Sequence, residues 1–165
     1  MRVGIGYDVH RFEAGRSLVL GGVVVPGADG LSGHSDADVL THSLIDALFG
    51  AVAAGDIGDH FPDTDPELEG ISSLELLSRT LRTVRAKGYD VVNADISLVL
   101  DAPKLGQLKV KMAETLAETL GVDSSLVSVK ATTSEGLLSA EMADAAAAKA
   151  VVLLKRIGGR DPDGF

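Results

Sequence analysis

The chain has 165 residues and no cysteine, and its 15 Lys and Arg against 24 Asp and Glu give a formal net charge of −9. The length predicts one domain that can bury roughly 70% of its unfolded surface without disulfides, and the lack of cysteine excludes thiolate catalysis and Cys-based zinc sites. The acidic balance argues against a nucleic-acid-binding module, although a metal ion or a helix N-terminus can still neutralise a bound phosphate.

Strands and one long helix are expected in the first part of the chain. Residues 2–9 alternate and predict a strand, and residues 18–25 are two apolar runs around a Gly-Gly pair, which is typical of a hairpin turn but also occurs at bulges. The composition of residues 26–33 predicts a loop. A capping-box-like start at 35–38 and apolar residues at helical spacing predict a helix that runs to about Ala54 and ends at Gly55.

The rest of the chain is expected to alternate between helices and strands. The acidic, proline-containing residues 56–70 predict an irregular loop. The remaining predicted elements are a helix over about 73–87 capped by Gly88, a strand over 91–100, a turn at 102–104, a helix over 105–120 stopped by Gly121, a strand over 125–133 and an Ala-rich helix over 140–156.

These elements predict the α+β class, with a small mixed sheet that carries helices on one face. We expect a single domain over residues 1–157 and a flexible C-terminal tail over 158–165. The uncovered face of a sheet rich in Val and Leu is then expected to be buried by self-association. No apolar stretch resembles a signal peptide or approaches the ~18 residues of a membrane span, so we expect a cytoplasmic protein that does not bind membranes.

Several common catalytic motifs are missing. Gly4-Ile-Gly6 looks like the start of a dinucleotide fingerprint, but Val9 stands at the third glycine position. Asp63-Thr64-Asp65 begins like a calcium loop, but Leu68 stands where glycine is required. No P-loop, zincin or G-x-S-x-G motif occurs, so the sequence does not support the chemistries that depend on these motifs.

One candidate metal site combines a strand end with a helix. Asp8 and His10 are two residues apart at the end of the first strand, so their side chains leave the same face. His42 lies in the first helix, with Asp38 and Asp46 one turn away on either side. If the strand end packs beside this helix, Asp8, His10 and His42 supply three ligands and leave a fourth position open, which is the catalytic zinc pattern. The alternatives are a simple Asp–His hydrogen bond and an ordinary surface or core histidine.

Three further segments carry polar groups that suit a phosphorylated ligand. His34 and Ser35 come directly before the first helix, where free N–H groups point outward. The acidic segment 56–65 is either a solvated loop or a loop whose carboxylates hold substrate hydroxyls or a hydrated Mg²⁺. The hydroxyls and the carboxylate of segment 130–135 suit a metal-bridged phosphate or form an ordinary turn after a strand.

Taken together, these segments resemble the 2-C-methyl-D-erythritol 2,4-cyclodiphosphate synthase family over nearly the whole chain. The matching segments are Gly6-Tyr7-Asp8-Val9-His10, His34-Ser35-Asp36-Ala37-Asp38 with His42, Gly55-Asp56-Ile57-Gly58, Phe61-Pro62-Asp63-Thr64-Asp65, Ala102-Pro103-Lys104 and Lys130-Ala131-Thr132-Thr133. The resemblance implies a homotrimer whose sheets face each other and whose active sites lie between subunits. It also implies that 4-diphosphocytidyl-2-C-methyl-D-erythritol 2-phosphate is cyclised with release of CMP, in the non-mevalonate route to isoprenoid precursors.

The resemblance also assigns roles to particular residues. It implies that Asp8, His10 and His42 bind Zn²⁺, and that Glu135 binds a second divalent ion, Mg²⁺ or Mn²⁺, together with the substrate phosphates. It implies that His34 and Thr133 are catalytic groups that polarise or align the phosphates. The implied substrate-binding residues are Asp8, His10, His34, Ser35, Thr133 and Glu135 near the phosphates, Asp56, Gly58, Phe61, Asp63 and Asp65 on the methylerythritol side, and Ala102, Pro103, Lys104 and Thr132 on the cytidine side.

One stretch departs from the family pattern. Residues 139–144 read Ser-Ala-Glu-Met-Ala-Asp, where the family carries a Gly-rich F-T-G-R-G-E-G stretch. Ser139 and Met142 replace an aromatic residue and an arginine that in the family contact phosphate and line the central cavity of the trimer. A helix starting near Ser139 could replace the glycine loop. The departure favours, as the alternative function, a catalytically weakened trimeric homologue that binds nucleotide and metal, and a third hypothesis is a metal-dependent phosphohydrolase.

Overall fold

The computed structural model describes residues 1–137 and 144–158, which form a mixed sheet of five strands in the order β2-β1-β5-β3-β4. Strands β3 and β4 run parallel, and the other neighbouring pairs are antiparallel. The strands are β1 (Arg2–Leu20), β2 (Val23–Leu31), β3 (Tyr89–Val99), β4 (Val127–Thr132) and β5 (Ala145–Arg156). The predicted hairpin turn is confirmed, because Gly21 and Gly22 join β1 to β2.

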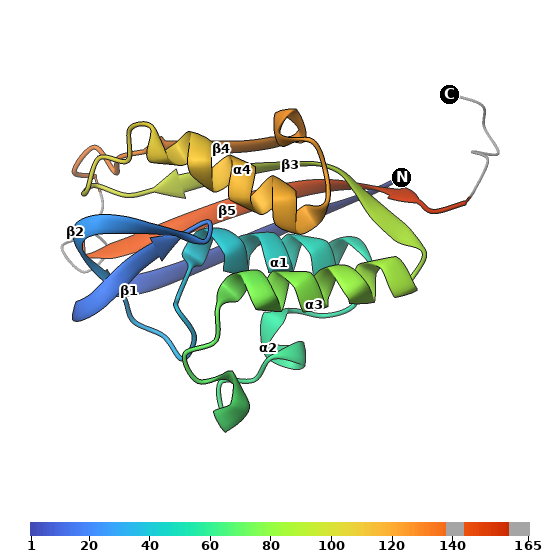
Figure 1. The fold of residues 1–165 in the computed structure, drawn as a ribbon, viewed down its shortest axis with the longest axis horizontal. Helices are drawn as coiled ribbons and strands as arrows, with labels where there is room; N and C mark the ends of the chain where they lie inside the picture. The colour runs from blue at the N-terminus through green and yellow to red at the C-terminus, as the bar shows by residue number, and fades with distance from the viewer. Residues whose placement is uncertain (138–143, 159–165) are drawn as a thin grey trace.

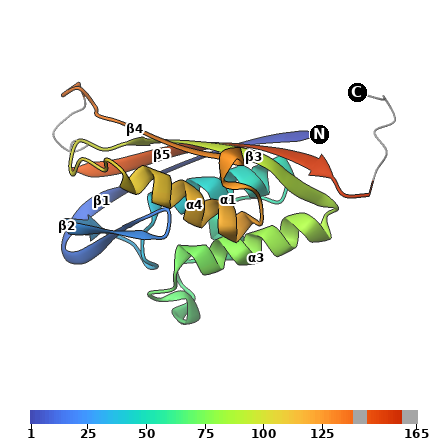
Figure 2. The same ribbon diagram turned by 45° about the horizontal axis from the view of Figure 1, so that its top comes forward.

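The helices lie on one face of this sheet, as Figures 1 and 2 show. The helix α1 packs against β1 and β5, α3 packs on α1, and α4 packs beside β4. Their bounds, with those of the shorter helical segments, are α1 (Val39–Ala51), α2 (Ile57–His60), η1 (Pro66–Leu68), α3 (Ser73–Ala86), α4 (Leu108–Leu120) and η2 (Ser124–Leu126). The predicted α+β class with helices on one sheet face is therefore confirmed.

Two glycines bring the backbone of α1 unusually close to β1. A Cβ atom on Gly4 would lie 1.9 Å from the carbonyl oxygen of Ala47, and one on Gly6 would lie 2.0 Å from that of Ser43. These distances are far below van der Waals contact, so any side chain at either position would push α1 away from the sheet. Asp8 follows Gly6 on the same face of β1, so the close packing also determines how far α1 lies from Asp8.

The prediction of an Ala-rich helix over 140–156 is wrong for the residues that the structure describes. Residues Ala145–Arg156 form β5, a central strand hydrogen-bonded to β1 on one side and to β3 on the other. Its buried side chains alternate with more exposed ones, which is the period of a strand: Ala146, Ala148, Ala150, Val152 and Leu154. Pairing on both edges outweighs the helix propensity of alanine. The helix considered near Ser139 falls outside the described residues.

Other predicted boundaries also need correction. Most of the loop predicted over 26–33 belongs to β2, which continues to Leu31, the partner of Phe12 in β1, across two register shifts. The segment 56–70, predicted to be irregular, contains the short helices α2 and η1. The helix α1 ends at Ala51 rather than near Gly55. The proposed tail over 158–165 lies outside the described residues from position 159 onward.

The second face of the sheet carries apolar side chains that no helix of the described chain covers. Val3, Ile5 and Tyr7 alternate along β1 on this face, and Val151 lies on the neighbouring strand β5 in register with Ile5. Ile5 is 70% exposed. Among the described residues, no helix has the length and apolar character needed to cross a membrane.

Candidate functional site

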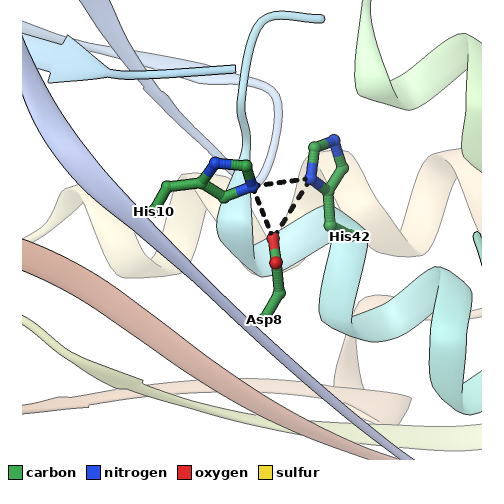
Figure 3. Close-up of side chains that lie close together, drawn as sticks. All are labelled: Asp8, His10 and His42. Atoms are coloured by element: carbon green, nitrogen blue, oxygen red, sulfur yellow. Dashed lines mark hydrogen bonds and ion pairs between the residues drawn. The ribbon is translucent and has the colours of Figure 1, made fainter. Parts of the chain in front are cut away.

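Asp8, His10 and His42 meet at the place where β1 passes the first turn of α1 (Figure 3). The Oδ2 atom of Asp8 lies 2.9 Å from Nε2 of His10 and 3.1 Å from Nδ1 of His42. The two nitrogens are 3.3 Å apart. Two imidazole nitrogens and one carboxylate oxygen facing a common point form a donor set that suits a divalent cation such as zinc.

The outer nitrogen of each imidazole has a protein partner. The Nδ1–H group of His10 donates to the carbonyl oxygen of Ser32 at 2.6 Å. The Nε2 atom of His42 lies 2.8 Å from the hydroxyl of Ser73 and 3.1 Å from that of Ser35. Partners of this kind orient the ring of a metal-binding histidine and leave its inner nitrogen available. The residues present therefore fit a bound cation.

The cluster is partly buried, and this affects its titration. Burial alone would raise the pKa of Asp8, but hydrogen bonds from His10 and His42 outweigh burial and hold that pKa well below its usual value. Burial lowers the pKa of His10, but the hydrogen bond to Asp8, the negative charge of Asp8 and the hydrogen bond to the Ser32 carbonyl together outweigh burial, so the pKa of His10 is raised. Asp8 is therefore an anion at neutral pH, and a cation that binds here competes with a proton for the inner nitrogen of His10.

The two other carboxylates next to His42 in the helix do not join this cluster. The fully buried carboxylate of Asp38 accepts hydrogen bonds from the backbone N–H groups of Gly21, Gly22 and Thr41 at 2.9, 2.7 and 3.1 Å. Burial raises the pKa of Asp38 despite these bonds. Asp46 accepts from the backbone N–H of Ile57 at 2.8 Å. Asp38 thus fixes the start of α1 against the β1–β2 turn, and Asp46 fixes the start of α2.

A cavity of about 430 Å³ opens beside the cluster. The sequence-predicted residues that line it are Asp8, His10, His34, Ser35, His42, Gly58, Phe61 and Asp63. Sequence reasoning missed its apolar wall of Leu68, Ile71 and Leu76, whose pattern does not distinguish them from core residues. The cavity is therefore lined by both ionic groups and apolar side chains.

Asp56 and Asp65 do not line this cavity but hold the loops around it. The Asp56 carboxylate caps α2 by accepting from the backbone N–H of Asp59 at 3.0 Å. The Asp65 carboxylate caps η1 by accepting from the backbone N–H of Glu67 at 2.9 Å. The carbonyl oxygen of Asp65 lies 3.0 Å from Nε2 of His34, so this loop also orients the imidazole of His34.

The predicted residues of the cytidine side form a second cavity of about 290 Å³. Pro103, Lys104, Thr132, Thr133 and Glu135 line it, whereas Ala102 lines a neighbouring hollow. Within one chain, therefore, the structure does not bring Thr133 and Glu135 to the cavity beside the Asp8 cluster. The residues singled out from the sequence fall into two separate groups.

Sequence reasoning missed Asp101, which connects the two loops of the second cavity. Its carboxylate accepts hydrogen bonds from the backbone N–H and the hydroxyl of Ser134, both at 2.6 Å. The hydroxyl of Thr133 donates to Glu135 Oε1 at 2.6 Å. The only sequence signal for Asp101 was its position directly before the predicted turn at 102–104.

A family model described as the YgbB family matches residues 1–155. The chain belongs to the YgbB family. A relative from Desulfosudis oleivorans, named 2-C-methyl-D-erythritol 2,4-cyclodiphosphate synthase, is 53% identical over 164 residues that cover 99% of this chain and 98% of that protein. The family resemblance seen in the sequence is thereby confirmed.

Solved structures of this YgbB-family fold are similar over most of the chain. A structure of 2C-methyl-D-erythritol-2,4-cyclodiphosphate synthase in a CDP-bound form has a TM-score of 0.85 and 40% identity, and the match covers 93% of this chain and all of that one. The bifunctional IspDF from Campylobacter jejuni has a TM-score of 0.90 and 41% identity over 94% of this chain, which spans 42% of that longer protein.

Proposed function

We propose that this YgbB-family chain is a metal-dependent cyclase, a phosphorus–oxygen lyase of the non-mevalonate isoprenoid pathway. It converts 4-diphosphocytidyl-2-C-methyl-D-erythritol 2-phosphate to 2-C-methyl-D-erythritol 2,4-cyclodiphosphate and releases CMP. The observation that carries the proposal is the Asp8, His10 and His42 cluster that lines a cavity, in a chain whose relatives are named 2-C-methyl-D-erythritol 2,4-cyclodiphosphate synthase.

The proposed cofactor of the cluster is Zn²⁺, held by Asp8, His10 and His42. Nitrogen and carboxylate ligands are typical of zinc, and three protein ligands leave one position open. When bound, the ion supplies Lewis-acid polarisation of a phosphate oxygen. Glu135 is the proposed protein ligand for a second divalent ion, Mg²⁺ or Mn²⁺, which it would share with the substrate phosphates.

The role of the side chains in this proposal is to position a reactant that carries its own nucleophile. The 2-phosphate is already an anion and is tethered to the diphosphate that it attacks, so the reaction needs orientation more than a strong base. His34, held against the Asp65 carbonyl, faces the cavity beside the cluster and is proposed to polarise a phosphate. Thr133 is proposed to align the phosphates from the second cavity.

The proposal includes assembly into a homotrimer, because the two cavities are separate within one chain. We infer that the uncovered sheet faces pack together, so that the cavity lined by Lys104, Thr132 and Glu135 completes the Asp8 cluster of a neighbouring subunit. The exposed apolar residues on β1 and β5 support this arrangement, because they are buried once sheets face each other. Light scattering after gel filtration tests it, with an expected mass three times the 17.0 kDa of one chain.

Product analysis tests the reaction itself. The purified chain is incubated with the substrate, and CMP and the cyclic diphosphate are followed by chromatography and ³¹P NMR. We expect equimolar products, loss of turnover after metal removal by a chelator, and recovery with Zn²⁺ and Mg²⁺ together. His42→Ala should abolish turnover, because one of the three ligands is lost. Unchanged turnover in that variant would contradict the proposal.

The same assay separates the alternative functions. Ser139 and Met142, which replace the aromatic residue and arginine of the family pattern, favour a weakened homologue. Such a protein would bind CDP without turnover, and a phosphohydrolase would release inorganic phosphate. The cytoplasmic location expected from the sequence stays a prediction.

A further inference from the structure

A carboxylate and a serine hydroxyl lie in line behind the outer nitrogen of His42. Ser73, the first residue of α3, is fully buried, and its hydroxyl oxygen lies 2.8 Å from His42 Nε2. On its other side the same hydroxyl donates to Asp36 Oδ1 in a short contact. The second oxygen of Asp36 accepts from the backbone N–H of Ser73 at 3.0 Å. Asp36, Ser73 and His42 thus form a chain of hydrogen bonds that ends at the metal-binding ring.

The direction of these hydrogen bonds follows from the donors that are present. A carboxylate can only accept, so the single hydroxyl proton of Ser73 is used in the bond to Asp36. The oxygen of Ser73 can then only accept from His42, which favours a proton on Nε2, whereas Asp8 Oδ2, 3.1 Å from Nδ1, favours a proton on the opposite nitrogen. A neutral ring with its proton on Nε2 has a lone pair on Nδ1. That nitrogen faces Asp8 Oδ2 at 3.1 Å and is the proposed metal ligand.

We propose that Asp36 and Ser73 are positioning residues, which hold His42 in the Nε2–H tautomer so that Nδ1 can bind the cation. The inference rests on the proposed function in one respect, namely that Nδ1 of His42 is a metal ligand. Neither residue touches the cluster's inner atoms or lines the adjoining cavity. His10 obtains its tautomer from the carbonyl of Ser32, whereas His42 depends on two side chains that can be changed.

Asp36→Asn is the most informative substitution, because it reverses the direction of the hydrogen bonds while keeping the shape of the side chain. The backbone N–H of Ser73 can only donate and lies 3.0 Å from one oxygen of Asp36, closer than the backbone N–H of Asp38, which lies 3.4 Å from the other, so the Ser73 N–H takes the amide oxygen of the new asparagine. The amide nitrogen then faces the Ser73 hydroxyl and donates to it. The hydroxyl proton turns toward His42 Nε2, and the ring carries its proton on Nδ1, where the cation should bind. An aspartate-to-asparagine change behind a histidine is known to damage catalysis through the wrong tautomer.

Ser73→Ala removes the acceptor instead of reversing it. Ser35 still lies 3.1 Å from Nε2 and can accept part of that bond, so a mixture of tautomers is expected. The matched control is Ser72→Ala, because Ser72 caps the same helix by accepting from the backbone N–H of Leu74 and does not contact His42. The control therefore measures the effect of a weaker helix start alone.

The experiment measures the tautomer and the metal affinity separately. Long-range ¹⁵N NMR of the metal-free, ¹⁵N-histidine-labelled protein, at alkaline pH where the rings are neutral, identifies the protonated nitrogen of His42, and His42→Gln assigns its signals. Competition with a chromophoric chelator measures zinc affinity, and circular dichroism checks that each variant is folded. If Ser73→Ala fails to fold, Asp36→Asn, which is equal in size to the native residue, carries the test.

We expect the largest share of the Nε2–H tautomer in the unsubstituted chain, a smaller share in Ser73→Ala and the smallest in Asp36→Asn. Zinc affinity should fall about 10- to 100-fold in both, with Asp36→Asn the weaker binder, and stay unchanged in Ser72→Ala. The inference is overturned if neither variant lowers the share of the Nε2–H tautomer, or if Ser72→Ala loses as much affinity as they do. If the unsubstituted chain binds no zinc, the proposed function fails, and the tautomer measurement still decides the inference.

Discussion

His42 Nδ1 lies 3.1 Å from Asp8 Oδ2, although 34 residues separate the two side chains in the sequence. The contact exists because Gly4 and Gly6 let the backbone of α1 settle directly on β1. The ion-binding geometry and the packing of the fold are therefore coupled at one place. Changes in the strand should disturb the cluster even when every ligand is present.

Gly6→Ala tests this coupling. The new methyl group would lie 2.0 Å from the carbonyl oxygen of Ser43, so α1 must move away from β1. We expect a loss of about 1–3 kcal/mol in the free energy of unfolding, as is typical of overpacking, together with weaker zinc binding. Chemical denaturation and chelator competition measure the two effects.

Gly50→Ala is the matched control for this change. A Cβ atom at Gly50, which lies in α1, would be 3.8 Å from the nearest atom and finds ordinary contact. This variant should keep or raise stability, because alanine favours a helix more than glycine does. A Gly6→Ala protein as stable as the Gly50→Ala protein would contradict the packing argument.

The metal-free protein should lose stability as the pH rises through the folded pKa of His10. That pKa is raised by Asp8, so the folded state binds the proton more tightly than the unfolded state. The stabilisation is complete below the ordinary histidine pKa of about 6.5 and disappears above the raised value. Asp8 has a lowered pKa, so its own contribution is lost only at acidic pH, as the pH falls through that value.

Thermal unfolding of the metal-free protein across this pH range measures the effect, with Asp8→Asn as the comparison. The variant should show a smaller loss of melting temperature on the alkaline side, because its side chain carries no charge to raise the pKa of His10. Zinc affinity in the unsubstituted chain should change in the opposite sense and increase with pH, since the proton competes with the ion. Parallel pH profiles for the two proteins would count against the Asp8–His10 pair.

Asp101→Ala should weaken nucleotide binding without removing any residue assigned to it. Its carboxylate holds Ser134, and thereby the turn that carries Thr133 and Glu135. We expect CDP affinity to fall about tenfold, the effect of roughly one hydrogen bond to a charged group, as measured by titration calorimetry.

Asp123→Ala controls for the loss of an exposed turn-capping carboxylate. Asp123 accepts from the backbone N–H of Ser125 at 2.9 Å and does not line the second cavity. It should bind CDP like the unsubstituted chain. Equal CDP affinities for Asp101→Ala and Asp123→Ala would contradict the role of Asp101 in nucleotide binding.

Ile5→Lys should break the proposed trimer. Ile5 is 70% exposed on the apolar sheet face, and a lysine there would place a charge in the interface. We expect light scattering to show one chain instead of three. Val110→Lys, a change at a 56% exposed position on α4, should leave the assembly intact. A trimeric Ile5→Lys protein would show that another surface holds the subunits together.

The sequence was sufficient to predict the candidate metal ligands because each follows a simple local period. Asp8 and His10 share a strand face, and His42 occupies a helix with a regular apolar stripe. Their meeting depended on tertiary packing, and the available signal was the pair Gly4 and Gly6 on the same strand face. Asp36 and Ser73 could not be connected, since 37 residues separate them and each also fits an ordinary helix start.

The last strand could not be predicted because alanine occupies both its buried and its more exposed positions, so the sequence shows no alternation of apolar and polar residues. In β5 the buried Ala146 and Ala148 alternate with Ala145 and Ala147, so the two faces carry the same side chain. A prediction from the local sequence is then determined by the high helix propensity of alanine. The strand forms because β1 and β3, which are distant in sequence, supply hydrogen-bonding edges on both sides.

Anomalous diffraction from a crystal grown with Zn²⁺ and CDP locates the bound cation and the nucleotide in one experiment. The proposed metal site predicts one strong zinc peak coordinated by Asp8, His10 and His42, with CDP in the cavity lined by Lys104 and Thr132. A zinc peak elsewhere, or three side chains that remain in direct contact with no ion between them, would contradict it.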